Sequence, residues 1–212
     1  SVEDVRRRGA RLSLLGVDLR TGAAIKSVTR TQGSGQIQPA YSLPEEFDEV
    51  VMACHSDQSL ALLSDASEWE RDALGAVSYR DNRAVLHADP RQMPRRRNCW
   101  SSWVYQARTD GPSTGGVGVS YWMNRLQNIP DDDPMFVTLN PQTHVREDLI
   151  YDEVTFAHPV FDGAALRAQK TIAARNGENS TWFAGAWLRF GFHEDGFASA
   201  VRVARALQPV TA

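Results

Sequence analysis

The chain has little of several features that would assign it quickly to a class of protein. Only two of its 212 residues are cysteines, Cys54 and Cys99, too few for a disulfide-stabilised secreted domain or a cysteine-rich metal site. We expect both thiols to be free and buried. The 23 basic and 26 acidic residues nearly balance, so the chain has no general attraction for nucleic acid or for an anionic membrane.

Long apolar runs are also absent. No stretch approaches the roughly 20 residues that a membrane-spanning helix needs, and no signal peptide opens the sequence. We therefore expect a cytoplasmic protein. The first residues, from Ser1 onward, read as the end of a helix that enters a strand, as expected for a part of a longer polypeptide.

A further absence concerns dinucleotides. No G-x-G-x-x-G follows a strand anywhere in the sequence, so the usual loop that binds a pyrophosphate is missing. The basic run Arg95-Arg96-Arg97 has two interpretations, a solvated turn or a contact with a phosphate or carboxylate.

The strongest positive signal lies in residues 181–200. They predict a buried strand, a loop with glycines, and a helix that begins at Asp195-Gly196. Helical spacing predicts a buried apolar face on that helix, made by Phe197, Ala200, Val201, Ala204 and Leu207. A glycine in the first turn and free N–H groups there favour close approach of an anionic partner. An ordinary strand–loop–helix unit is an equal alternative.

The rest of the chain predicts a mixed fold. Residues 47–54 are apolar and β-branched at their centre, as is typical of a buried strand in a parallel sheet. Ser67 and Asp162 each predict the start of a helix. An antiparallel sheet is predicted for the middle of the chain from the strand candidates 83–88, 100–106, 117–123, 136–139 and 151–157.

Several segments, in this order, carry a resemblance to a known family: residues 47–58, 82–87, 93–97, 100–103, 120–127, 136–141, 158–162 and 183–196. In them the chain resembles the C-terminal half of bacterial FAD-dependent oxidoreductases of the flavin amine oxidase and phytoene desaturase-like superfamily, in the branch described as predicted NAD/FAD-binding proteins. The resemblance covers nearly the whole chain from about Leu19 onward.

The resemblance implies an α+β and α/β fold divided in three. Residues 1–60 would be a partial FAD-binding domain segment and residues 61–160 a substrate domain with an antiparallel sheet. Residues 161–212 would supply the closing strand, loop and helix of the Rossmann-like FAD-binding domain. The N-terminal βαβ unit would be missing from this chain, and a missing half or a partner chain would supply it.

The resemblance also implies cofactor-binding residues. Ile25 would lie beside the adenine, and Ala53 would line the FAD domain. The loop residues Gly185, Ala186 and Trp187 would approach the pyrophosphate or ribityl chain, although relatives often carry an acidic residue where this chain has Ala186. Five residues at the helix N-terminus would lie at the isoalloxazine: His193, Glu194, Asp195, Gly196 and Phe197. None of these residues has the partners at helical spacing that a metal site needs.

Aromatic residues are concentrated in two of the predicted strands. Trp103 and Tyr105 share one face of the sheet, whereas Tyr121 and Trp122 point to opposite faces. They form either core packing or an apolar wall over the flavin. Asn124 either orients a polar group of the substrate or holds a turn. His87, near Asp89, either points into a substrate cavity or is a core histidine.

Three hypotheses about function follow. The first is an FAD-dependent oxidoreductase that acts by hydride transfer on an apolar, for instance lipid-like, or amine substrate, with no residue of this chain assigned as a catalytic base. The second is a non-catalytic subunit or fragment that binds no flavin alone and docks on the chain carrying the G-x-G-x-x-G half. The third is a binding module for apolar ligands.

Overall fold

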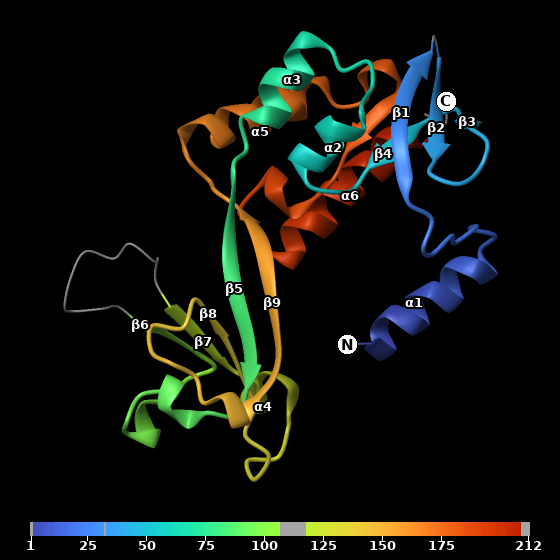
Figure 1. Cartoon of the computed structure of the whole chain (residues 1–212). Helices are drawn as coiled ribbons and strands as arrows, with labels where there is room; N and C mark the ends of the chain where they lie inside the picture. The colour runs from blue at the N-terminus through green and yellow to red at the C-terminus, as the bar shows by residue number, and fades with distance from the viewer. Residues whose placement is uncertain (1, 32, 107–117, 209–212) are drawn as a thin grey trace. The chain divides into compact units, whose positions relative to one another are not determined.

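The strands of this chain form three separate sheets among the described residues, two antiparallel and one parallel. The residues described by the computed structural model are 2–31, 33–106 and 118–208. The chain forms two units (Figure 1): unit 1 combines Ser1–Ser78 with Phe161–Ala212, and unit 2 is Tyr79–Val160. The mixed fold class with antiparallel sheets is thus confirmed. Residues 61–78, which the sequence places with the middle sheet, belong to unit 1.

Unit 1 contains two small sheets. The first is an antiparallel meander of β1 (Ile25–Thr31), β2 (Ser34–Pro39) and β3 (Glu45–Phe47). The second pairs β4 (Val50–Met52) with β10 (Thr181–Phe183) in parallel. The predicted strand 47–54 is therefore divided, because Phe47 belongs to the meander and only the centre of the segment pairs with β10.

The helices of unit 1 are α1 (Val2–Leu14), α2 (Ser56–Leu62), α3 (Glu68–Gly75), α5 (Gly163–Arg175) and α6 (His193–Leu207), with the 3-10 turns η4 (Glu178–Ser180) and η5 (Ala186–Leu188). The two predicted helix starts are confirmed. The backbone N–H and hydroxyl of Ser67 both donate to Glu70 at 2.7 Å. The Asp162 carboxylate accepts from the amides of Ala164 and Ala165.

Helix α6 differs from its prediction in both start and orientation. It begins at His193, and its buried residues are Asp195, Ser199 and Val203. The predicted apolar face is exposed or only half-buried, and the Phe197 ring is 61% exposed. Polar groups of α6 face inward because they hold the loop before the helix, which periodicity cannot reveal.

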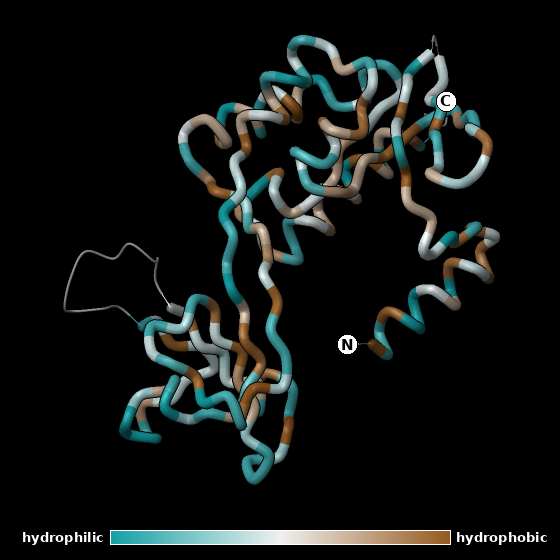
Figure 2. Tube along the Cα trace, viewed as in Figure 1, coloured by the Kyte–Doolittle hydropathy of each residue, from teal (hydrophilic) through white to brown (hydrophobic). Residues whose placement is uncertain are grey.

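Unit 2 is built on one antiparallel sheet with the strand order β6-β7-β8-β5-β9. Its strands are β5 (Tyr79–His87), β6 (Trp103–Gln106), β7 (Gly118–Trp122), β8 (Phe136–Leu139) and β9 (Ile150–Pro159); its helical pieces are α4 (Met123–Gln127), η1 (Pro90–Gln92), η2 (Arg97–Cys99) and η3 (Glu147–Leu149). All five strand predictions correspond to observed strands, although Val117 lies outside the described residues. Figure 2 shows β5 changing from hydrophilic to hydrophobic along its length; its second half also pairs with β8.

The two faces of this sheet differ in burial. Directly paired residues share a face, and on one face Val85, His87, Ser120, Trp122, Phe136 and Thr138 are all buried. We call the other face the open face, and it consists of Ala84, Leu86, Trp103, Tyr105, Val119, Tyr121, Val137, Leu139, Asp152 and Val154. Of these, only Ala84 is buried. The sheet therefore presents a largely apolar, accessible surface.

Candidate functional site

The two parallel strands of unit 1 end at the same edge of their sheet, and two distant segments meet there. The amide of Ala184, after β10, donates to the carbonyl of Met52 at the end of β4. The indole N–H of Trp187 donates to the Cys54 carbonyl at 3.0 Å. Ligands of open α/β sheets bind outside the carboxyl ends of the strands. The structure thus brings the predicted residues Ala53, Gly185 and Trp187 to one edge.

The Trp187 ring packs so closely on Gly185 that there is no room for a side chain at this position. A Cβ atom there would lie 2.6 Å from Nε1 of the buried Trp187, a distance that real side chains do not tolerate. Its amide donates to the Ser199 hydroxyl at 2.9 Å, and that hydroxyl donates to the Gly196 carbonyl. The Gly185 amide is therefore engaged with α6.

The carboxylate of Asp195, in the first turn of α6, binds the backbone of the loop that precedes the helix. Asp195 is buried and accepts from the amides of Phe190 and Phe192; the Arg189 Nε atom lies 3.6 Å from its other oxygen. Gly196, expected to leave room for a ligand, instead faces the loop, because a Cβ there would meet the Ala186 nitrogen at 3.5 Å. Asp195 and Gly196 therefore shape the loop itself.

The remaining predicted residues around this turn are accessible. His193, Glu194 and Phe197 are exposed at the helix N-terminus, as are Phe190 and Phe192 in the preceding loop. Three phenyl rings thus flank the end of α6, where the resemblance implies that the isoalloxazine would lie. The accessible groups that could meet a ligand here are aromatic rings, one imidazole, the Glu194 carboxylate and the first amides of the helix.

Ile25 lies in a separate hollow. This hollow of about 410 Å³ is lined on one side by Ile25, Ile37, Pro39 and Phe47. Arg20 lies at its polar side, paired with Asp18 and Glu45. The hydrogen bonds that its guanidinium donates to Glu45 and Asp18 raise the pKa of Arg20. The hollow has the apolar walls that a flat ring system needs.

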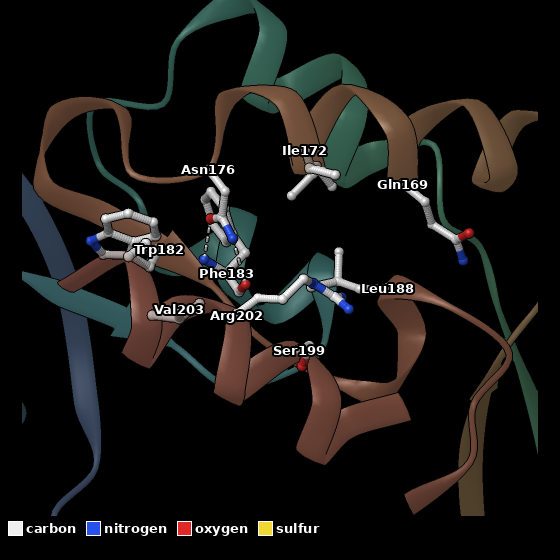
Figure 3. Close-up of a pocket in the computed structure, with 11 residues that line it drawn as sticks. Gln169, Ile172, Asn176, Trp182, Phe183, Leu188, Ser199, Arg202 and Val203 are labelled. Carbon is white, nitrogen blue, oxygen red and sulfur yellow. Dashed lines mark hydrogen bonds between the residues drawn. The ribbon is translucent and has the colours of Figure 1, made fainter. Parts of the chain in front are cut away.

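A second cavity, about 280 Å³, lies between α5 and α6 (Figure 3). Ile172 points down from α5, and the side chain of Arg202 extends from α6 along the opposite side. Two amide side chains are already engaged: Asn176 bonds both backbone groups of Phe183, and Gln169 donates to the carbonyls of Trp187 and Arg189. Arg202 was not predicted as a site residue, although it shares a helix face with Ser199, Val203 and Ala206 at helical spacing.

The predicted substrate residues of unit 2 separate into two groups. Trp103 and Tyr105 are exposed and pack edge to face, with ring centroids 5.0 Å apart; Tyr121 is paired with Trp103 on the open face. Trp122 instead lies in the core with Met93 and Phe136.

The sequence allowed two roles for Asn124, and the structure shows that it holds a turn. Its amide donates to the carbonyls of Pro130 and Asp133, and its carbonyl oxygen accepts from the amide of Met135. The buried carboxamide thus holds the 129–135 loop. His87 is likewise a core residue with no exposed surface. Of the two thiols, Cys54 is half-buried and Cys99 is exposed, so the expected burial of Cys99 is wrong.

Comparison with known proteins gives a fold and no family. No protein-family model matches the sequence, and no curated protein matches it either. Among solved structures, the CLA-producing fatty acid isomerase from P. acnes is similar with a TM-score of 0.61 and 16% identity, over 88% of this chain and 48% of that one. A single mutant of putrescine oxidase, from a redesign of cofactor binding, has a TM-score of 0.60 and 11% identity over 92% of this chain and 50% of that one.

Wild-type putrescine oxidase bound to putrescine is also similar, with a TM-score of 0.59 at 12% identity. The chain spans about half the length of these solved structures. The chain therefore shares the fold of about half of each of these enzymes, in agreement with the fold that the sequence resemblance implies. In the described part of the chain, no helix combines the length and apolarity needed to cross a membrane.

Proposed function

We propose that the chain contributes to a cytoplasmic, FAD-dependent oxidoreductase. Unit 1 would supply the closing part of the FAD-binding domain, and unit 2 would be the substrate domain. FAD, when bound, supplies the hydride transfer itself. The residues of this chain would position the cofactor and the substrate and exclude water from them.

One observation carries this proposal: the meeting of Ala53–Cys54 with Gly185–Trp187 at the carboxyl edge of the parallel pair. This is the edge at which α/β sheets bind nucleotides. The aromatic rings of Phe192 and Phe197 beside the α6 N-terminus suit a flat ring system, and the amides of His193 and Glu194 suit negative charge.

The residues of this chain suit the adenine and isoalloxazine ends of FAD better than its pyrophosphate. The hollow at Ile25 suits the adenine. The Gly185 amide, engaged with Ser199, is not available for the pyrophosphate. We therefore assign the pyrophosphate to a G-x-G-x-x-G segment outside residues 1–212, and the adenine and isoalloxazine ends to this chain.

The open face of unit 2 suits an apolar substrate. Trp103, Tyr105 and Tyr121 form an accessible aromatic corner of this face, and ligand pockets are mostly apolar with few polar groups. Asp152 is the one carboxylate on the open face and would suit the ammonium group of an amine substrate. Both an apolar, lipid-like substrate and an amine therefore fit, in keeping with the names of the similar enzymes.

Flavin retention by the whole chain tests the proposal. We expect the chain, incubated with FAD and separated from the excess, to keep a flavin absorption band. Gly185→Ala should reduce FAD affinity at least tenfold, because the new Cβ displaces Trp187 from Cys54. Gly163→Ala is the matched control, because a Cβ there meets only the end of the Arg167 side chain at 3.4 Å. Equal FAD affinities of the two variants would argue against this edge as the site.

The second candidate, a subunit that docks on a chain carrying the G-x-G-x-x-G half, is favoured by the small size of the parallel sheet. Among the described residues, β4 and β10 pair only with each other, and Val51 of β4 is 44% exposed. Parallel sheets are normally buried and larger. A colourless chain that gains flavin only with such a partner would support this candidate. A tryptophan fluorescence response to fatty acids without one to FAD would indicate the apolar-ligand module.

A further inference from the structure

Unit 2 carries a pocket of about 610 Å³ that the proposed function does not use. Among the residues that line it are Arg91, Met93, Arg95, Trp100, Thr143 and His144. It lies between two segments, residues 90–100 and residues 143–144, and its volume is within the range typical of small-molecule sites.

Two fully buried polar side chains hold the walls of this pocket in place. The Gln92 amide nitrogen donates to the Thr143 hydroxyl at 3.0 Å and to the carbonyls of Thr143 and His144. The Asp89 carboxylate accepts from the Arg91 guanidinium and from the Arg146 amide. Neither Gln92 nor Asp89 has exposed surface. The pocket is thus formed in advance, which lowers the cost of binding.

Trp100 forms a rigid aromatic wall. Its indole N–H donates to the Pro94 carbonyl at 2.7 Å. Its ring packs edge to face on Trp122 and Phe136, with centroids 5.2 and 5.6 Å away. The half-buried Trp100 offers an apolar surface of fixed orientation, with the buried Met93 in the core behind it.

The arginines of the basic run 95–97 have different surroundings near this pocket. Arg97 pairs with Asp131 at 2.9 Å and lies over the rings of Trp100 and Trp122. Arg95 lines the pocket, and within the described residues neither Arg95 nor His144 makes a side-chain hydrogen bond or ion pair. No acidic residue is among those lining the pocket.

We propose that this pocket binds a small organic phosphate whose phosphate group is attached to a flat apolar ring. Arg95 and His144 bind the phosphate from opposite walls, and the part of the Arg91 guanidinium that Asp89 does not use supplies a third donor. Three donors from different directions suit the three terminal oxygens of a phosphate monoester better than the two of a carboxylate. The ring packs on the accessible part of Trp100. This inference is independent of flavin binding.

Calorimetric titration of the whole chain with phenyl phosphate tests it, with inorganic phosphate, phenol and benzoate as comparison ligands. We expect phenyl phosphate to bind at least tenfold more tightly than each of the other three. Arg95→Gln should weaken its binding tenfold or more, and His144→Gln should weaken it several-fold. Arg96→Gln, a neighbouring arginine that does not line the pocket, should change it less than twofold.

Other outcomes would overturn the inference. Equal weakening by Arg95→Gln and Arg96→Gln would mean general attraction by positive charge. Equal affinity for inorganic phosphate would mean an ion site without a ring, and equal affinity for benzoate would mean that the pocket does not select phosphate. Absence of binding heat, with unchanged circular dichroism of the variants, would mean that the pocket takes none of these compounds.

Discussion

At the scale of single residues, buried hydrogen-bond partners keep the imidazole of His87 in unit 2 neutral. His87 accepts at Nδ1 from the Asp89 amide at 3.0 Å and donates at Nε2 to the Thr138 hydroxyl at 2.8 Å. Thr138 is bonded to Ser120, which donates to the Gln92 carbonyl. This arrangement requires a neutral imidazole, because a second proton at Nδ1 would face the Asp89 N–H. Burial lowers the pKa of His87 to about 4, although the Asp89 charge opposes the shift.

The stability of unit 2 should therefore depend on pH in the mildly acidic range. The unfolded chain protonates His87 near pH 6.5 and the folded chain only near pH 4, so the stabilisation is complete above about pH 6.5. It is lost progressively as the pH falls to about 4, by about 3 kcal/mol in total. Urea unfolding between pH 4.5 and 7.5 should show this slope in the wild type and not in His87→Gln. The exposed His193→Gln variant is the control, and an unchanged slope in His87→Gln would contradict the assignment.

At the scale of elements, unit 1 depends on a close contact between its two sheets. Gly35 of β2 lies against Val50 of β4, where a Cβ on Gly35 would fall 2.5 Å from the Val50 Cγ2 atom. Val50 is buried. The meander can approach the parallel pair this closely because the residue at position 35 has no side chain.

We expect Gly35→Ala to destabilise unit 1 by about 1–3 kcal/mol, the usual cost of overpacking a core. The double variant with Val50→Ala should recover part of this loss, because the methyl group that the new Cβ meets is gone. Urea unfolding of the wild type, both single variants and the double variant measures the coupling. Strictly additive effects would show that the contact does not limit the packing of the two sheets.

At the scale of the whole molecule, the chain contains two units with separate cores. Unit 1 includes a buried ion pair in which both Glu70 oxygens accept from the Arg30 guanidinium, and the two side chains are 0% and 4% exposed. Burial alone would raise the pKa of Glu70, but hydrogen bonds from Arg30 and Ser67 outweigh it and lower the pKa. The core of unit 2 contains the His87 network instead.

Removing one partner of this ion pair should destabilise unit 1 alone. Arg30→Met leaves a buried, uncompensated carboxylate and should cost about 3–5 kcal/mol. Hydrogen exchange should then accelerate in β1, α2 and α3 and stay unchanged in β5, β7 and β8. The exposed Arg205→Met on α6 is the control. Equal acceleration in both units would mean that they unfold together.

The sequence by itself determined the features that depend on neighbours along the chain. The helix starts at Ser67 and Asp162 and the five strands of unit 2 follow from side-chain chemistry and alternation within a few residues. The shared face of Trp103 and Tyr105 follows from the two-residue period of a strand. The segments that resemble amine oxidase-like enzymes also predicted the fold.

Only the tertiary structure decided which groups remain available for ligands. Asn124, Asp195 and the Gly185 amide look like binding groups in the sequence, but they bond to the chain's own backbone. The buried face of α6 and the pocket beside Trp100 were likewise decided by partners far away in sequence. A polar group binds whichever partner the fold places nearest, and hydrophobic periodicity contains no information about that partner.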